Sequence, residues 1–312
     1  MKVFRHWTDL PPSARGGVVA VGNFDGVHRG HRVVIGAALA QARAAGRPAG
    51  VLTFEPHPRS LFRPDDPPYR LTPFRLKARL IEALGLDYLY VLAFDRALAG
   101  LPAESFVNEV LLNGLGTRHL VVGDNFHFGH KRQGDVSLLQ AMGRAHGFGV
   151  TALARADGPD AAPISSTRIR ALLKAGEPKA AAALLGRPFE IEGRVVVGQR
   201  LGRKLGFPTA NLELGEFLEP AHGIYAVRAA LDQGDKLLWR PGVANLGVRP
   251  TVGAGDPLLE VHLFDFEGDL YERHLRVALV EYLRPEAKFE SLEALKRKML
   301  DDAAQARALL EA

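Results

Sequence analysis

Five short apolar runs, separated by segments with helical periodicity, constrain the fold of this chain more than any other feature. The runs occupy residues 18–21, 50–54, 88–94, 119–122 and 150–153. Between them, apolar residues recur every three or four positions, as on one face of a helix. Strands that alternate with helices form a parallel sheet covered by helices on both faces. The pattern therefore predicts a doubly wound, Rossmann-like α/β domain.

Two of these helices have recognisable ends. Thr72 and Pro73 have the residue types of an N-cap and a first helical residue. Pro102 is placed to begin another helix, and Gly114 is placed to end it. We expect ligands at the carboxyl ends of the strands, as in other open α/β sheets.

The second part of the chain has a different pattern, in which apolar runs are separated by Gly, Pro and Asp turns. These runs lie at 190–197, 224–230, 237–239, 258–264 and 275–282. No helix-length segment intervenes, so we expect an antiparallel β-barrel or sheet. A C-terminal helix follows from about Ser291. Its predicted core-facing residues are Leu292, Leu295, Met299, Ala303, Ala306 and Leu309.

The domain boundary is predicted at the alanine-rich segment 179–185, which ends at Gly186. A length of 312 residues agrees with about two domains. The first domain is expected to span residues 1–186 and the second residues 187–312.

Composition excludes several classes of protein. The chain has no cysteine, which rules out disulfides, thiol catalysis and thiolate metal sites. It has neither a signal-peptide pattern at the N-terminus nor an apolar run long enough to span a membrane, so we expect a cytoplasmic protein without a membrane partner. The net charge of +5 favours anionic partners. Because the basic residues are scattered, a solvated basic face is the favoured interpretation over nucleic-acid binding.

The first candidate site is GNFDGVHRGH, residues 22–31, directly after the first predicted strand. Its glycines allow a tight turn and a close approach to a ligand, and the following helix directs N–H groups at an anion. His28 and His31 can donate hydrogen bonds to a phosphate. The alternatives are an exposed glycine-rich turn and a chance metal pair. The candidate nucleotide-binding residues are Gly22, Asn23, Phe24, Asp25, Gly26 and Gly30.

Three other loops are expected at the same edge of the sheet. ISSTRIR, residues 164–170, concentrates donors at a helix start, namely Ser165, Ser166, Thr167 and Arg168. FEPHPRSLF, residues 54–62, begins a long irregular stretch of the kind that is usually functional. GDNFHFG, residues 123–129, carries two aromatic residues able to stack on a planar ring.

The second candidate site begins with GQRLGRKLGFPTAN, residues 198–211. Thr209 and Asn211 stand two positions apart, so they lie on one side of an extended strand and offer two oxygens suited to Mg²⁺. A basic hairpin with a proline turn is the alternative. The candidate phosphate-binding residues of this loop are Gly198, Gly202, Arg203, Lys204 and Gly206.

Glu260 is the candidate general base of this second site. Alternation along the strand places Glu260, His262 and Phe264 on one face. A carboxylate on an inward face beside a nucleotide site can take the proton from an attacking hydroxyl. The alternative is a surface carboxylate on an edge strand.

The four loops of the first domain resemble, in order, the adenylyltransferase module of bifunctional bacterial riboflavin kinase/FAD synthetases. The resemblance implies that His28 and His31 bind ATP phosphates, with Ser165, Thr167 and Arg168 opposite them. It also implies that FMN attacks the α-phosphorus and releases pyrophosphate. Asn23 would approach the transferred phosphate, and Phe62, Asn125 and Phe128 would line the flavin side. Many relatives have Asp at the position of Asn125.

The second domain resembles the riboflavin kinase module of the same family. The resemblance implies a six-stranded Greek-key barrel in which Thr209 and Asn211 bind Mg²⁺ and ATP, while Glu260 activates the ribityl hydroxyl. Arg249 is a further expected flavin contact. Relatives usually have Gly at the position of Glu272.

Together, the two resemblances imply an enzyme that converts riboflavin to FMN and then FMN to FAD, with ATP as co-substrate of both steps. A homo-oligomer is left open. One alternative is that one module is idle or regulatory. Another is a basic β-barrel that binds nucleic acid, joined to an unrelated nucleotidyltransferase, although the aromatic ladder of single-strand binders is not evident.

Overall fold

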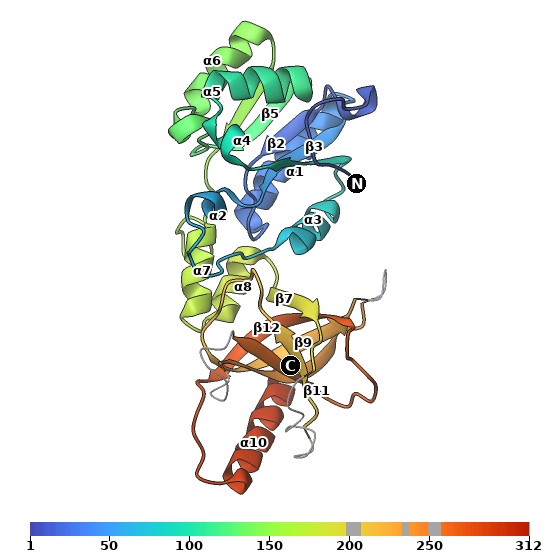
Figure 1. Cartoon of the computed structure of the whole chain (residues 1–312), viewed down its shortest axis with the longest axis vertical. Coiled ribbons are helices and arrows are strands. Elements are labelled where there is room, and N and C mark those ends of the chain that lie inside the picture. Colours follow the sequence, from blue (N-terminus) through green and yellow to red (C-terminus); the bar gives the residue numbers. More distant parts are fainter. Residues whose placement is uncertain (198–206, 233–236, 249–256, 312) are drawn as a thin grey trace. The chain divides into compact units, whose positions relative to one another are not determined.

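The computed structural model describes residues 1–197, 207–232, 237–248 and 257–311. The chain forms two compact units (Figure 1). The first unit contains Met1–Pro67 and Thr72–Ser165. The second unit contains Pro68–Leu71 and Ser166–Ala312.

The first unit is built on a six-stranded sheet in which every neighbouring pair is parallel. Its strand order is β1-β4-β3-β2-β5-β6. The five predicted strands are confirmed, and β1 is a sixth that the sequence did not reveal because three residues are too few to display a pattern. The strands are β1 (Lys2–Phe4), β2 (Val18–Val21), β3 (Ala49–Glu55), β4 (Tyr88–Ala93), β5 (His119–Gly123) and β6 (Gly149–Leu153).

Helices cover both faces of this sheet, as predicted for a doubly wound fold. Val18 and Ala20 pack with the helices α1 and α3, whereas Val19 and Val21 pack in a cluster with α5, η2 and α6. Alternate residues of one strand therefore supply two separate cores. The helical elements are η1 (Pro12–Ala14), α1 (Arg29–Ala44), α2 (Pro58–Phe62), α3 (Phe74–Glu82), α4 (Arg96–Gly100), α5 (Ala103–Ser105), η2 (Phe106–Gly114), η3 (His130–Arg132) and α6 (Val136–His146).

The predicted start of α3 is wrong by one residue. The N-cap of α3 is Pro73, which forms no side-chain cap hydrogen bond, and the helix begins at Phe74. Thr72 is fully buried, and its Oγ1 accepts a hydrogen bond of 2.8 Å from the N–H of Gly26. A tertiary contact therefore takes the hydroxyl that would otherwise cap the helix. The helix expected after Pro102 is confirmed, and residues Phe106–Gly114 of it are a π-helix.

The second unit contains a six-stranded antiparallel sheet of order β7-β12-β9-β10-β11-β8. Strand β12 returns beside β9 after the β9-β10-β11 meander, which is the Greek-key arrangement. The outer strands approach each other where Val196 N–H donates to the carbonyl of Asn211 over 2.9 Å, so the barrel is nearly closed. The strands are β7 (Phe189–Arg194), β8 (Ala210–Glu213), β9 (Gly223–Leu231), β10 (Arg240–Gly247), β11 (Leu258–Leu263) and β12 (His274–Arg284).

One strand of the barrel, β10, begins later in the sequence than predicted. Residues 237–239 were expected to be a strand, but the strand β10 begins only at Arg240. Its Pro241, Gly242 and Asn245 have low strand propensity. Pairing with β9 on one side and β11 on the other overrides this local preference.

The helices described in the second unit are α7 (Ser166–Lys174), α8 (Pro178–Leu185) and the C-terminal α10 (Leu292–Glu311). Segment Pro68–Leu71 also belongs to this unit, because Arg70 N–H donates to the carbonyl of Glu216 and the carbonyl of Arg70 accepts from Leu218 N–H. Arg170 of α7 donates to the carbonyl of Tyr69 over 2.8 Å. Among the described residues, no helix has the length and apolar character required to cross a membrane.

Only part of the apolar stripe predicted for α10 packs against the barrel. Ala306 and Leu310 pack against Ala226 and Phe264 of the barrel, whereas Leu292 and Leu309 are 57% and 43% exposed. Leu295 and Met299 line a cavity rather than a closed core. The spacing predicts one continuous core face, but in the structure the first half of the helix borders this cavity.

Ion pairs join α10 to the barrel. Asp302 of α10, which is buried, accepts hydrogen bonds of 3.0 and 2.7 Å from the guanidinium of Arg284 at the end of β12. Arg307 forms two hydrogen bonds with Asp265, and these hydrogen bonds lower the pKa of the Asp265 carboxyl. Polar contacts thus supplement the small apolar interface of the helix.

We expect His119 to make the stability of the first unit depend on pH. Burial lowers the pKa of His119, whose Nε2 lies 2.8 Å from Thr151 Oγ1. Because the unfolded chain binds this proton more readily, the contribution is complete above the ordinary pKa of about 6.5 and is lost as the pH falls through the folded-state value. His119→Gln should therefore reduce the loss of unfolding free energy between about pH 7 and pH 5.

The measurement is urea unfolding followed by the fluorescence of Trp7, in a Trp239→Phe background so that only the first unit is observed. His146→Gln is the matched control, since His146 is exposed. Equal pH dependence in His119→Gln and the control would contradict the expectation.

Candidate active sites

The loop that follows β2 occupies the switch point of the parallel sheet. Strand β2 pairs with β3 on one side and β5 on the other. After β2 the chain adds β3 and β4 on one side of it, and then adds β5 and β6 on the other side. Loops at such a point diverge and leave a crevice at the carboxyl ends of the strands. The predicted phosphate-binding segment, residues 22–31, starts at this position.

The backbone of this loop explains its glycines. A Cβ on Gly22 would lie 3.1 Å from the ring of Phe24, and Gly26 has φ of 93°, which disfavours other residues. Phe24 and Asp25, which were expected to bind nucleotide, are both buried. Asp25 Oδ1 accepts a 2.9 Å hydrogen bond from the N–H of Thr72. These two side chains therefore help to build the loop.

The two histidines lie together at the start of α1. His28 is the N-cap, and its Nδ1 accepts a 3.2 Å hydrogen bond from the N–H of His31. The rings are stacked with centroids 3.5 Å apart and an angle of 17° between planes. Because Nδ1 of His28 is an acceptor, its proton is assigned to Nε2. The pair thus offers imidazole donors beside the N-terminus of a 16-residue helix.

The ISSTRIR segment is divided between the two units. Ile164 is buried, and its Cβ lies 3.9 Å from the position of a Cβ on Gly30, in the first turn of α1. Ser165 is the last residue of the first unit. Three of the predicted residues begin α7 in the second unit, namely Ser166, Thr167 and Arg168.

A chain of aromatic rings connects the two predicted flavin loops. Phe62 of α2 is 67% exposed, and its ring centroid lies 6.0 Å from that of Phe94. Phe94 contacts Phe54, Phe54 contacts Phe106, and Phe106 contacts Phe128, with centroids 5.7 to 6.4 Å apart. Phe128 is buried and Asn125 is exposed. The exposed ring of Phe62 therefore has a rigid aromatic backing.

In the barrel, Glu260 lies between two amides. Its register partners are Asn211 on β8 and Asn245 on β10, and residues paired in this way have side chains on the same face. Oδ1 of Asn245 is buried with no hydrogen-bond partner in the described part of the barrel. Glu260, His262 and Asn245 line the same cavity, of about 370 Å³.

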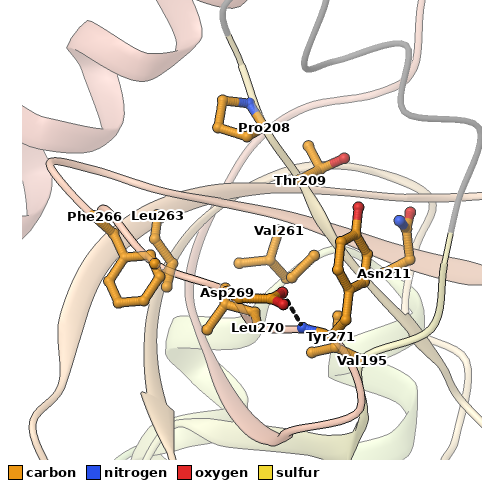
Figure 2. A pocket seen from close by; sticks show the side chains of 12 residues that line it. Val195, Pro208, Thr209, Asn211, Val261, Leu263, Phe266, Asp269, Leu270 and Tyr271 are labelled. Carbon is orange, nitrogen blue, oxygen red and sulfur yellow. Dashed lines mark hydrogen bonds between the residues drawn. The ribbon is translucent and has the colours of Figure 1, made fainter.

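A second cavity of about 540 Å³ adjoins this row. Figure 2 shows Thr209, Asn211 and Tyr271 at one side of it and Leu263 and Phe266 at the other. Thr209 lines both cavities. A phosphate donor in one cavity and a hydroxyl acceptor in the other would therefore meet near Thr209.

The first cavity also contains residues that sequence reasoning did not assign to a site. The sequence patterns gave Asn245 no role, and they predicted that Leu295 and Met299 face a core. The pairing of Asn245 with Glu260 depends on strand register, which sequence alone does not supply. Several predicted residues lie outside the described ranges: Gly198, Gly202, Arg203, Lys204, Gly206 and Arg249.

These features define a class of protein, a two-unit enzyme with a nucleotide site at a parallel-sheet switch point and a phosphotransfer site in a barrel. The family model described as FAD synthetase matches residues 10–168, and the riboflavin kinase model matches residues 185–310. The chain belongs to the bifunctional riboflavin kinase/FMN adenylyltransferase family, with the FAD synthetase part N-terminal and the kinase part C-terminal.

Individual relatives agree over the full length. The bifunctional riboflavin kinase/FMN adenylyltransferase of Pseudomonas fluorescens is 47% identical and covers 99% of this chain and 98% of its own. The protein of the same name from Escherichia coli K12 is 43% identical, covering 98% and 97%. A crystal structure named macrolide-efflux protein, from Streptococcus pneumoniae, has a TM-score of 0.86 at 28% identity and covers 98% of each chain.

Glu272 provides a test of local strain beside the larger cavity. It adopts φ of 60°, a conformation that costs non-glycine residues about 1 kcal/mol. We therefore expect Glu272→Gly to stabilise the second unit by up to about 1 kcal/mol, measured by urea unfolding with Trp239 as the probe.

The control is Glu290→Gly, because Glu290 is exposed and does not have a positive φ. It should be neutral or destabilising. Equal effects of the two substitutions would show that backbone strain at Glu272 is not the cause.

Proposed function

We propose that this chain phosphorylates riboflavin with ATP to give FMN and ADP, and then transfers AMP from a second ATP to FMN to give FAD and pyrophosphate. The adenylyltransferase domain is assigned to residues 1–186 and the kinase domain to residues 187–312. The observation that supports this best is the pair of cavities that share Thr209, with Glu260 on the wall of one of them.

In the kinase reaction, Glu260 is assigned as the general base. It would take the proton of the ribityl 5′-hydroxyl, whose oxygen then attacks the γ-phosphorus as the bond to ADP breaks. The flanking amides of Asn211 and Asn245 lie on the same face as Glu260 and can orient the hydroxyl by hydrogen bonds. Arg249 is kept as a flavin contact, and the loop residues Gly198, Gly202, Arg203, Lys204 and Gly206 as phosphate contacts.

Thr209 and Asn211 fit a role in holding Mg²⁺ together with nucleotide phosphates. Both line the larger cavity and carry neutral oxygen donors, and the described residues contain no cluster of three or more His, Cys, Asp or Glu suited to a metal. Mg²⁺ is often bound through few protein ligands and the substrate phosphates. When bound, it would neutralise charge on the phosphates during transfer.

In the adenylyl transfer, the FMN phosphate is already ionised and attacks the α-phosphorus directly, and pyrophosphate leaves. No general base is required, so the protein acts by positioning and by stabilising charge. His28 and His31 would donate to the phosphates above the N–H groups of α1. Asn23 would approach the transferred phosphate, and Ser165, Ser166, Thr167 and Arg168 would bind the nucleotide as well.

For the flavin of this second step, we assign the contact surface to Phe62, with Asn125 beside it and Phe128 in support. The exposure of Phe62 and the row of rings behind it, from the half-buried Phe94 to the buried Phe128, support this assignment. We further propose that the enzyme works in the cytoplasm on small-molecule substrates and needs no nucleic-acid partner.

The test of the whole proposal is a time course of purified protein with riboflavin, ATP and Mg²⁺, with the flavins separated by chromatography. FMN should appear first and then give way to FAD. FMN without FAD would leave the first domain as an idle or regulatory module. Absence of both products, combined with salt-dependent RNA or DNA binding, would favour the nucleic-acid alternative.

We expect Glu260→Gln to decrease the rate of FMN formation by about 10²- to 10⁴-fold, because the amide cannot accept the hydroxyl proton. FAD formation from supplied FMN should be unchanged. Glu267→Gln, on the exposed turn after β11, is the matched control. Loss of both activities in Glu260→Gln would refute the assignment of two separate sites.

We expect His31→Asn to lower the kcat of FAD formation from FMN by about 10²-fold or more, since a donor to the developing charge is lost. FMN formation from riboflavin serves as an internal control and should persist. His146→Asn, at an exposed position of α6, should retain both rates. A normal rate of FAD formation in His31→Asn would remove His31 from the site.

A further inference from the structure

A fully buried lysine stands in the first unit, beneath the loop after β2. Lys77 of α3 has 0% exposure, and its helical neighbours Leu76 and Ile81 are also buried in the core. Moving an ammonium group out of water is costly unless it is paired and hydrogen-bonded. An apolar side chain of similar size at such a position is often as stabilising or more so. The buried charge therefore calls for an explanation other than packing.

The ammonium of Lys77 contacts two of the loops that form the candidate adenylyltransferase site. Its Nζ lies 2.6 Å from Oε1 of Glu55, the last residue of β3. It also donates to the carbonyl oxygen of Asn23 over 3.2 Å, in the loop after β2. A third contact, of 3.3 Å, is to Oγ1 of Thr53, whose hydroxyl itself donates to the carbonyl of Asn23 over 3.2 Å.

These contacts join two loops that open at the same edge of the sheet. The loop after β2 continues to His28 and α1, and the loop after β3 continues to α2 and Phe62. The carboxylate of Glu55 is mostly covered, with 13% of its side chain exposed. The ammonium binds a backbone carbonyl in the loop after β2 and the carboxylate at the end of β3, where the second loop begins. The relative positions of the two loops therefore depend on it.

The loop after β2 is held at two places, by Thr72 in its middle and by Lys77 at the Asn23 carbonyl. Thr72 binds Asp25 and the N–H of Gly26, which secures the middle of the loop. The backbone at Asn23 is instead held through Thr53 and Lys77. Since the side chain of Lys77 is inaccessible, it can act on a substrate only through the groups that it positions.

We propose that Lys77 is a positioning residue for adenylyl transfer, which holds the Asn23 backbone and the Glu55 carboxylate so that the loop after β2 faces the transferred phosphate and the loop after β3 faces the flavin. The inference rests on the function proposed above for the first domain. Misplacement of reacting groups by about 1 Å can cost about 10²-fold in rate. The effect should therefore appear in kcat more than in the KM for ATP.

The first experiment compares Lys77→Met with wild-type protein. The kcat for FAD formation from FMN should fall by about 10- to 100-fold, with less change in the KM for ATP. FMN formation from riboflavin, catalysed by the other domain, should be unchanged. Arg75→Met is the matched control, because Arg75 is an exposed residue on the same helix and should retain both activities.

A second variant separates positioning from folding, because Lys77→Met leaves Glu55 buried without its ammonium partner. The double variant Lys77→Met/Glu55→Gln removes both charges and should regain the thermal stability of the first unit, followed by Trp7 fluorescence. The inference expects kcat to remain low in this folded double variant. Recovery of kcat together with stability would overturn it, because the lysine would then be needed only for folding.

Chemical rescue is possible because the chain has no other cysteine to react. Lys77→Cys, aminoethylated with bromoethylamine in urea and then refolded, restores an ammonium at nearly the same place. It should regain kcat, whereas a refolded and unmodified sample should not. Wild-type kcat in Lys77→Met would overturn this inference alone. Wild-type protein that forms no FAD from FMN would overturn the proposed function as well.

Discussion

The parallel direction of the six strands in the first unit is the constraint on which its site depends. Parallel strands all end at one edge, so the loops after β2, β3 and β5 open on the same side of the sheet. At the switch beside β2 the neighbouring loops diverge, and a crevice is expected at this edge of the sheet. Within this frame, buried polar contacts determine loop geometry: Thr72 holds Asp25 and Gly26, and Lys77 holds Asn23. Buried polar groups therefore lie beneath the candidate site. Their hydrogen bonds define the position of a backbone carbonyl, which contacts with apolar side chains alone would not do.

In the barrel, cross-strand register positions the side chains of the candidate site. Antiparallel pairing places Asn211, Glu260 and Asn245 in one row across three strands. A shift of one residue would turn each of these side chains to the other face. The helix α10 adds Leu295 and Met299 to the wall of the cavity that Glu260 lines. The buried Asp302 holds this helix to β12. Strand register and helix docking together bring Glu260, the two amides and the apolar wall to one place.

Much of this organisation was predictable, because local patterns and tertiary structure agree. The five longer parallel strands have short, mainly apolar runs, and the barrel follows from short strands separated by turns. The prediction failed where a tertiary contact replaced a local one. Thr72 binds the Gly26 loop rather than capping α3, and β10 forms in spite of Pro241 and Asn245 because it has a partner on each side. Leu292 and Leu309 are exposed since only part of α10 packs on the barrel.

By itself, the sequence determined the succession of elements, the change from α/β to β architecture and the identity of the segments that carry His28, Phe62, Thr209 and Glu260. These properties depend on periodicity and on residue type, which are local. Tertiary structure alone decided which of these groups meet: the row through Glu260, the two cavities that share Thr209 and the burial of Lys77 beneath Asn23. The physical reason is that register, packing and desolvation are properties of pairs of segments far apart in the chain, and no local pattern encodes their distance.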